Sequence, residues 1–552
     1  MNIILKGDTI KEVVAILTED EKEVFKKQHR WISDKVDLDI SRMSDETVSK
    51  VYDILDSEHK AGGENARSAA LSKGQVKQWQ EIKKNPKGGV VTKLSSLPAA
   101  ILAFVGTSEN RYLFRQLGDG NSVPYFLISA VYTPSQDYSP AQVKVGMAAH
   151  NSYTSGNYYS HGRRGSDGAT ASITFYEEDY RGKTVDAILR ERGYFLETPE
   201  RMESYEKEMV RFMEIRSTDG HQVNVVGKAV PSSGGWSRSD FRGVEKSGAP
   251  AKMVVDPKED EGSPVSAMIC SIWNDKGEDY LWEIPYHPFV RLFDLDDHVG
   301  VRSHINNISD YEYDKEVGDK LVLEDETKEL LEILVNHAAD SFEDIVSGKQ
   351  GGSVILLAGL PGVGKTLTAE VYSEVMGRPL YRVQSSQLGI TVTALEEELK
   401  TVLGRAERWG AILLIDEADV YIRARGTEIE QNAIVGVFLR VLEYYRGVLF
   451  MTTNRGTEID DAIVSRLTAS ITYAMPSEAN QHKLWKILSG QNGVELSNRD
   501  LATIFASHPN LSGRDIKNLL KLASRVASAK GEKVTPELIK RVSKFKQCSG
   551  DV

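Results

Sequence analysis

The spacing of hydrophobic residues changes along the chain, and each change predicts a different kind of structure. Residues 9–64 are polar, and their hydrophobic positions recur at helical spacing, for example at Val13, Leu17 and Val48. Between residues 90 and 293, aromatic and β-branched runs alternate with Gly, Pro, Asn and Ser, which is typical of strands and turns. We therefore predict a helical lead-in over residues 1–64 and a β-rich N-terminal domain over residues 65–310.

The β-rich region also contains a helical stretch. Strand-like runs lie at residues 125–131, 171–176, 223–226 and 267–273. Between the second and the third run, residues 184–215 carry hydrophobic residues at helical spacing. This mixture predicts an α+β domain rather than a pure β-sandwich, with loops in the segments rich in Gly, Ser, Pro and charge at residues 231–242 and 256–264.

From Leu321 onward the pattern becomes an alternation of strands and helices, and the chain ends in a helical region from residue 478 to residue 546. Alternation of this kind is typical of an α/β domain with a parallel sheet. We predict a multidomain protein with a boundary near residues 310–319. Its C-terminal part would be an α/β module over residues 320–477, followed by a small α-helical lid and tail over residues 478–552.

A phosphate-binding loop follows the first strand of this module. Residues 353–358 form a short apolar run that leads directly into GLPGVGKT at residues 359–366, and helical spacing continues to Met376. In the pattern GxxxxGK[ST], backbone N–H groups turn toward the β-phosphate, the lysine reaches the β- and γ-phosphates, and the hydroxyl binds Mg²⁺. The sequence therefore predicts a nucleotide site formed by Gly359, Pro361, Gly362, Val363, Gly364, Lys365, Thr366 and Leu367.

Two adjacent carboxylates end the strand at residues 411–415. Asp416 is placed to hold Mg²⁺ together with Thr366, and Glu417 is placed to orient and deprotonate water. A strand that ends in a polar turn is common, but two acids downstream of a phosphate loop favour the catalytic interpretation.

Three further polar residues follow in the same module. A strand at residues 448–451 leads to Asn454, whose amide could hold the attacking water near the γ-phosphate. Arg466 lies in DDAIVSR and Arg514 in LSGRD. Taken alone, an arginine is more often a surface charge than a functional group, so neither position assigns a role.

Taken in order, these motifs resemble those of the AAA+ ATPases over roughly residues 321–546. The loop at residues 359–366 is similar to Walker A, residues 413–417 to Walker B, and Asn454 to sensor 1. Arg466 matches the arginine finger that the family inserts into a neighbouring subunit, and Arg514 matches the sensor 2 arginine of the lid. The Ser-Gly-Arg form of the lid also resembles the HORMA-remodelling ATPases.

The resemblance implies an ATPase that uses ATP and Mg²⁺ and assembles into a hexameric ring with a single Walker A loop per subunit. Many members of the family that thread polypeptides have an aromatic residue in the first central loop, whereas residues 385–391 here have none. The chain then either does not thread polypeptides processively or grips them with Leu388 and Ile390 instead. A second pore candidate is the segment at residues 421–426, where Arg423 and Arg425 could contact an acidic chain or lie in water.

Charge and composition limit the remaining functions. The 552 residues carry 68 Lys and Arg against 80 Asp and Glu, a formal net charge of −12, which repels nucleic acid at long range. A basic and aromatic stretch at residues 150–165 resembles nucleic-acid binders, but a loop explains it equally well. The two cysteines do not form a disulfide framework. Without an apolar run long enough for a membrane helix or a secretory signal, we expect a cytoplasmic protein that does not span the membrane.

These observations lead to one expected function and two alternatives. We expect ATP hydrolysis by a ring that remodels or disassembles a protein client, with the N-terminal domain recruiting that client or an adaptor. An ATPase that loads onto or moves along nucleic acid would need a basic track, which the sequence has only in fragments. A nucleotide-gated assembly scaffold with negligible turnover is the third possibility, and the intact Glu417 and Arg466 argue against it.

Overall fold

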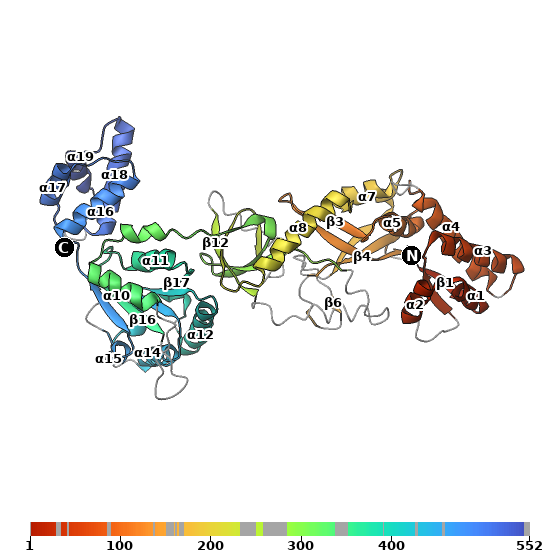
Figure 1. Ribbon diagram of the computed structural model, residues 1–552, viewed down its shortest axis with the longest axis horizontal. Coiled ribbons are helices and arrows are strands. Elements are labelled where there is room, and N and C mark those ends of the chain that lie inside the picture. The colour runs from red at the N-terminus through yellow and green to blue at the C-terminus, as the bar shows by residue number, and fades with distance from the viewer. Residues whose placement is uncertain are drawn as a thin grey trace.

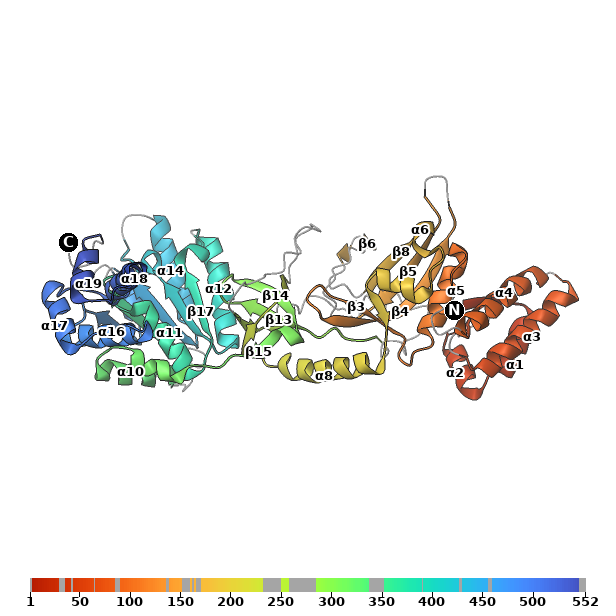
Figure 2. The ribbon, with the colours of Figure 1, turned by 90° about the horizontal axis from the view of Figure 1, so that it is seen from above.

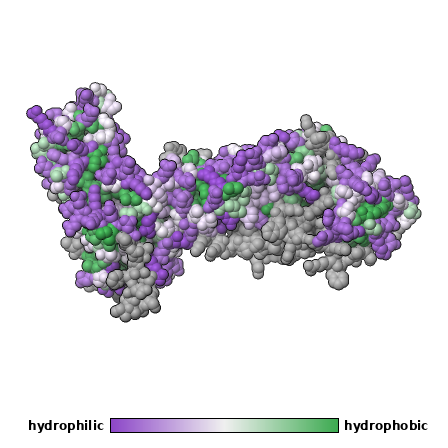
Figure 3. All heavy atoms as spheres, in the orientation of Figure 1, coloured by the Kyte–Doolittle hydropathy of each residue, from purple (hydrophilic) through white to green (hydrophobic). Residues whose placement is uncertain are grey.

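The computed structural model describes residues 2–28, 35–40, 43–63, 65–84, 90–135, 139–150, 159–160, 163–164, 170–231, 250–257, 284–336, 352–389, 391–425, 429–454 and 459–545. The chain is elongated and runs from an N-terminal helical unit, through two sheet-containing units, to a C-terminal α/β module with its helical lid (Figure 1). On the face shown in Figure 3, hydrophilic residues predominate and the apolar residues gather in separate patches. Among the described helices, none has both the length and the apolar character needed to cross a bilayer.

The N-terminal unit combines a short hairpin of strands with four helices around one core. Strands β1 (Asn2–Lys6) and β2 (Lys35–Asp39) pair antiparallel, and α1 (Asp8–Ile16), α2 (Glu19–Gln28), α3 (Asp45–Ala61) and α4 (Ala66–Lys83) complete the unit. The Ser44 hydroxyl caps α3 by accepting a hydrogen bond from the Thr47 amide at 3.1 Å. Val76 and Trp79 of α4 are buried in the same core as Ile3 and Val51. This unit therefore continues past residue 64, where we expected the helical lead-in to end.

The second unit is a five-stranded sheet with helices packed on it. Its strand order is β8-β5-β4-β3-β9, and all of its pairs are antiparallel. The strands are β3 (Tyr112–Gln116), β4 (Ser122–Thr133), β5 (Gln142–Ala148), β8 (Thr170–Phe175) and β9 (Tyr194–Leu196), with η2 (Leu94–Ser96), α5 (Leu97–Val105), α6 (Glu177–Tyr180) and α7 (Val185–Glu191). A separate pair consists of β6 (Tyr159–Ser160) and β7 (Arg163–Arg164). The predicted strands at residues 125–131 and 171–176 are confirmed as β4 and β8.

The third unit is a six-stranded sheet in the order β11-β14-β13-β12-β10-β15. It contains β10 (Gln222–Val225), β11 (Ala229–Pro231), β12 (Ala251–Val255), β13 (Phe289–Asp294), β14 (Val299–His304) and β15 (Ile308–Asp310), with η5 (Ile305–Asn307). Helix α8 (Pro199–Ile215) packs on this sheet through Phe212 and Ile215, and Figure 2 shows it reaching toward the five-stranded sheet. The predicted strand at residues 223–226 is β10, whereas the one at residues 267–273 lies outside the described residues. The region at residues 65–310 thus holds two sheets with different cores, where we expected one domain.

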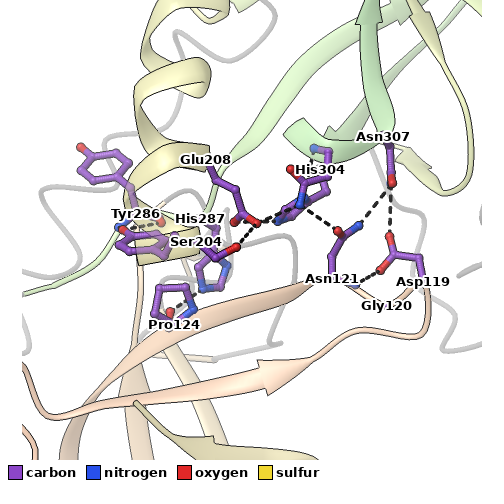
Figure 4. Close-up of polar contacts among 12 residues, drawn as sticks. Asp119, Gly120, Asn121, Pro124, Ser204, Glu208, Tyr286, His287, His304 and Asn307 are labelled. Atoms are coloured by element: carbon purple, nitrogen blue, oxygen red, sulfur yellow. Dashed lines mark hydrogen bonds and ion pairs between the residues drawn. The ribbon is translucent and has the colours of Figure 1, made fainter. Parts of the chain in front are cut away.

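A network of polar side chains joins the two sheet units (Figure 4). The Asn306 amide donates to Glu208 Oε1 at 2.8 Å and to Asn121 Oδ1 at 3.1 Å. The Asn307 amide donates to Asp119 Oδ2 at 3.2 Å, so the turn between β3 and β4 is bound to η5. His304 lies beside this network, fully buried, with Nε2 at 3.8 Å from Glu208 Oε2. Exposed and partly buried hydrogen bonds between side chains therefore connect the two units.

The C-terminal module is a five-stranded parallel sheet with helices on its faces. The strand order is β17-β18-β19-β16-β20, formed by β16 (Ser353–Gly359), β17 (Leu380–Gln384), β18 (Ile412–Asp416), β19 (Val448–Thr453) and β20 (Ala469–Tyr473). Its helical segments are η6 (Lys315–Lys320), α10 (Asp325–Asn336), α11 (Lys365–Met376), η7 (Ser385–Gln387), α12 (Val392–Arg408), α13 (Asp419–Ile422), α14 (Ile429–Leu442) and α15 (Asp461–Val464). The predicted parallel sheet is confirmed.

The lid is a bundle of four helices with a core of its own. It comprises α16 (Glu478–Gln491), α17 (Asn498–Ser507), α18 (Gly513–Lys530) and α19 (Pro536–Ser543), and its core includes Trp485, Ile516 and Ile539. Ser497 and Asp500 form a capping box on α17, and Ser512 and Asp515 form the same box on α18. These boxes therefore specify where α17 and α18 begin. The structure confirms the predicted helical C-terminal region.

The six-stranded sheet is packed tightly against the C-terminal module. Val254, Phe293 and Leu295 belong to the same hydrophobic core as the strands and helices of the parallel sheet, and the Phe293 and Trp409 rings lie 5.0 Å apart. Gly220 allows the backbones to approach, because a Cβ there would lie 2.4 Å from the Trp409 carbonyl oxygen. The two units therefore share one continuous apolar contact.

Candidate nucleotide-binding site

The loop at residues 359–366 connects β16 to α11 with the backbone geometry that a phosphate cradle requires. Gly359, Gly362 and Gly364 have φ values of 146°, 84° and 113°, a region that favours glycine. Gly364 immediately precedes α11, and a Cβ placed there would meet no atom within 4 Å. This open space, together with the N–H groups at the start of a 12-residue helix, forms a site for an anionic phosphate.

Lys365 lies at the centre of the predicted site. Its Nζ donates hydrogen bonds to the carbonyl oxygens of Gly359 and Leu360 at 2.7 and 2.8 Å, and to Asn454 Oδ1 at 2.9 Å. Burial lowers the pKa of Lys365, the nearby charge of Asp416 raises it, and that of Arg514 lowers it further. The Lys365 ammonium group is thus surrounded by residues from the loop, from β18, from the end of β19 and from the lid.

Asp416 accepts hydrogen bonds at both carboxylate oxygens. Oδ1 receives the Thr366 hydroxyl at 3.1 Å and the Thr452 hydroxyl at 2.6 Å, whereas Oδ2 receives Arg382 Nη2 at 2.5 Å. A carboxylate and a hydroxyl beside a phosphate loop are the ligands that Mg²⁺ uses when water and substrate phosphates supply the rest of its shell. The pair of Thr366 and Asp416 therefore fits this ion.

Glu417 lies next to this pair in a strained backbone conformation. Its φ is 57°, in the left-handed region, and its side chain is exposed. The Glu417 amide donates to Thr452 Oγ1 at 2.9 Å, while the same hydroxyl donates to Asp416. Thr452 therefore fixes both acids relative to each other, and strain of this kind is common where a side chain must be held in one direction.

The lid contacts the phosphate loop directly. The Arg514 amide donates to the Gly362 carbonyl oxygen at 3.2 Å, and a Cβ at position 362 would lie 2.7 Å from Arg514 Cβ and 2.8 Å from Ser512 Oγ. A hinge in the segment before Glu478 would thus change the environment of the loop. This backbone contact places Arg514 beside the phosphate loop, and its role as sensor 2 stays a prediction.

Arg466 has different partners within the chain. Its Nη1 donates to the Ala462 carbonyl oxygen at 3.1 Å, and its Nη2 lies 3.7 Å from Glu443 Oε2. These contacts are with α15 and with the residue that follows α14, and in the described part of the chain Arg466 is not among the partners of Lys365, Asp416 or Asn454. The structure therefore brings together the other predicted residues and leaves Arg466 on a separate surface.

The two predicted pore segments are connected to each other and to the core. Leu388 is fully buried, so its side chain is not a surface grip, and Ile390 lies outside the described residues. The Tyr421 hydroxyl donates to the Ser385 carbonyl oxygen at 2.6 Å and joins the two segments. Arg425 has a partner within its own chain, because its Nε donates to Asp460 Oδ2 at 2.8 Å, and its side chain remains 52% exposed.

Three residues at this site, Arg382, Glu370 and Thr452, were not predicted from the sequence. Tyr381 and Val383 of β17 are buried and Arg382 is exposed between them, so the alternation of the strand could have marked Arg382 as pointing away from the core. Its partner Asp416 lies on the neighbouring strand β18, which a local pattern does not reveal.

In the basic stretch at residues 150–165, His150 stacks on Tyr286 at 4.6 Å, while residues 151–158 lie outside the described part.

Comparison with known families agrees with this geometry. Residues 355–474 match the family described as the ATPase family associated with various cellular activities (AAA). The C-terminal module is an AAA+ ATPase domain. The match covers β16 through β20 and so includes Lys365, Asp416 and Arg466.

Curated relatives match less than half of the chain. The chain is 29% identical over 223 residues to the ATP-dependent zinc metalloprotease FtsH 2 of Salinibacter ruber (strain M8), covering 38% of this chain and 32% of the relative. It is 30% identical over 219 residues to spastin of Naegleria gruberi, covering 37% and 41%. The chain therefore spans less than half the length of these relatives.

Two solved structures likewise match less than half of the chain. The FIGL-1 AAA domain in complex with ADP gives a TM-score of 0.35 at 22% identity, covering 42% of this chain and 85% of that one. A chain of the E. coli MS115-1 HORMA:CdnC:Trip13 complex gives a TM-score of 0.36 at 18% identity, covering 43% and 93%.

Proposed function

We propose that the chain hydrolyses ATP with Mg²⁺ as one subunit of a ring and uses the energy to remodel a protein client. The observation that carries the ATPase part is the cluster of Lys365, Thr366, Asp416 and Asn454 around the phosphate loop, with the lid in contact at Gly362. These residues and the lid contact come from α11, β18, the end of β19 and α18. Their proximity is therefore a property of the fold rather than of one motif.

Each of these residues has a specific task in the proposed reaction. Lys365 and the loop amides hold the phosphates, and Thr366 and Asp416 would hold Mg²⁺, which neutralises the charge that develops on the transferred phosphoryl group. Glu417 accepts the proton of the attacking water, and Asn454 orients that water. Arg514 of the lid offsets the negative charge that develops on the transferred phosphoryl group.

The position of Arg466 supports the proposed ring. An arginine that stabilises the transition state must reach the phosphates, and within its own chain Arg466 contacts Ala462 and Glu443 instead. We propose that it completes the site of a neighbouring subunit in a hexamer. Tyr444 and Val464 are exposed near it, at 58% and 50%, which supports burial of this surface against another chain.

Protein is the favoured client. The relatives include proteases, and the formal net charge of −12 opposes nucleic acid. The N-terminal units, residues 1–310, would recruit the client or an adaptor, and we propose a cytoplasmic location. A loader or motor on nucleic acid is the alternative, and stimulation of turnover by DNA or RNA with a steep salt dependence would favour it.

The test compares nucleotide binding with turnover in matched variants. Glu417→Gln is expected to bind ATP and to lower turnover at least about 100-fold, because it removes only the base. Lys365→Ala is expected to lose nucleotide affinity. Glu398→Gln, on the exposed face of α12, is the control and should behave like the wild-type protein. Turnover at the wild-type rate in Glu417→Gln would contradict the assignment of the base.

A further inference from the structure

Arg382 lies between two carboxylates, one of which belongs to the proposed Mg²⁺ site. It is in β17, its side chain is 44% exposed, and its Nη2 is 2.5 Å from Asp416 Oδ2. Its other terminal nitrogen, Nη1, is 3.8 Å from Glu370 Oε1 on α11. Arg382 therefore makes a close ion pair with the first carboxylate and a loose one with the second.

The ion pair with Asp416 uses the carboxylate oxygen that the hydroxyl groups leave open. Oδ1 already accepts from Thr366 and Thr452, so Oδ2 is the oxygen on which a cation can act without breaking those bonds. Arg382 occupies that oxygen with a charge-assisted hydrogen bond. A metal ion approaching the Thr366 hydroxyl would meet a carboxylate whose charge is partly neutralised by the arginine.

We propose that Arg382 competes with Mg²⁺ for Asp416 and moves to Glu370 when the metal binds. This proposal rests on the nucleotide and Mg²⁺ binding proposed above. Arg382 thus acts as a positioning residue that sets the Mg²⁺ requirement of nucleotide binding. In the metal-free site it holds Asp416 in place, and in the loaded site it releases the carboxylate to the metal shell.

Glu370 is suited to receive the arginine. Burial raises the pKa of Glu370, and the charge of Arg382 lowers it, so a closer arginine would stabilise the carboxylate further. The charge of Asp416 raises the pKa of Glu370, whereas the charges of Lys517 in the lid and Lys252 in the six-stranded sheet lower it.

Glu370 lies on α11, and this helix also binds residues from the N-terminal part of the molecule. Glu374, one turn after Glu370, accepts hydrogen bonds from Tyr311 at 2.5 Å and from Lys252 at 3.2 Å. The proposed movement of Arg382 toward Glu370 therefore takes place beside α11, between the phosphate loop and the contact with the six-stranded sheet.

The experiment measures how much Mg²⁺ is needed for half-maximal binding of a fluorescent ADP analogue to the full chain. Arg382→Gln is expected to lower this concentration about fivefold, because it removes the competing cation. Glu370→Gln is expected to raise it about two- to fivefold, because the arginine then has no second partner. In the double variant, the effect of Glu370→Gln should disappear.

Arg440→Gln is the matched control. Arg440 forms an ion pair of the same 2.5 Å length with Glu396, outside the site, and its loss should leave the Mg²⁺ requirement unchanged. If Arg382→Gln does not fold, Arg382→Lys replaces it, since the shorter side chain weakens the contact and should shift the requirement in the same direction. An unchanged or raised requirement at position 382, or an effect of Glu370→Gln that persists in the double variant, would overturn the inference. Wild-type protein whose nucleotide binding ignores Mg²⁺ would instead contradict the proposed function, and this inference with it.

Discussion

Arg425 and Asp460 form an ion pair, with 2.8 Å between Nε and Oδ2, that joins the segment after Glu417 to the start of α15, the helix that precedes Arg466. Asp460 also accepts the amide of Ala462 at 3.0 Å and so caps α15. Burial alone would raise the pKa of Asp460, but the hydrogen bonds from Arg425 and Ala462 lower it. The position of Arg466 is therefore tied to the segment that follows the two acids.

Asp460→Asn should consequently lower turnover about 10- to 100-fold while leaving nucleotide affinity intact, because it misplaces Arg466 without touching the phosphate loop. Steady-state ATPase rates and binding of a fluorescent ADP analogue separate the two effects. Asp461→Asn, at the adjacent exposed carboxylate, is the control and should retain turnover. Equal rates in the two variants would show that the ion pair does not position the arginine.

The contact between the lid and the loop can be tested at Gly362. Gly362→Ala would place a Cβ against Arg514 and Ser512 and should move the lid away from the loop even without nucleotide. Gly364→Ala carries similar backbone strain, with φ at 113°, but meets no neighbouring atom. A fluorescence energy-transfer pair on α11 and α18 should report a longer distance only for the first variant. A distance change of equal size in both would attribute the effect to strain.

The junction between the six-stranded sheet and the AAA+ domain depends on Gly220. Gly220→Ala would place a Cβ at 2.4 Å from the Trp409 carbonyl oxygen, which is backbone and cannot move aside. Gly193→Ala has nearly the same φ, 77° against 81°, but open space. Each should cost about 1 kcal/mol for the left-handed conformation. In calorimetry, only Gly220→Ala should lower the transition temperature further and separate the unfolding of the two units.

His304 makes the stability of the junction between the two sheet units dependent on pH. Burial lowers the pKa of His304 to about 4, and the charge of Asp119 opposes this shift. Since the folded pKa lies below the ordinary value of about 6.5, the unfolded chain binds the proton more tightly. Stability is therefore full above about pH 6.5 and is lost progressively as the pH falls toward 4.

At pH 5 this loss should reach about 2 kcal/mol relative to pH 7. His287, buried and hydrogen-bonded to the Pro124 carbonyl, contributes in the same direction because burial lowers its pKa to about 3. Glu208 acts in the opposite direction, because burial raises its pKa. The comparison is therefore between wild type and His304→Gln in urea unfolding at both pH values. An equal loss in the two proteins would contradict the role of His304.

The nucleotide site could be predicted from the sequence because its main signals are local. The phosphate loop, the two acids at the end of β18 and Asn454 after β19 each occur within a few residues of a recognisable strand. The pairing of Arg382 with Asp416 could not be predicted, because it depends on β17 lying beside β18. In the N-terminal part, β10 pairs with both β12 and β15, and β15 lies more than 80 residues further along the chain. No local pattern contains such a pairing, which is why two sheets were expected as one domain.

The central claim is that Arg466 acts in the active site of a neighbouring subunit, and mixing two inactive variants tests it most directly. Lys365→Ala lacks a nucleotide site but keeps Arg466, whereas Arg466→Ala keeps the site but lacks the arginine. Each variant alone should have little ATPase activity. If the arginine acts between subunits, mixing them should restore a substantial part of the wild-type rate. No recovery in mixtures that co-assemble, or wild-type turnover by Arg466→Ala alone, would contradict the account.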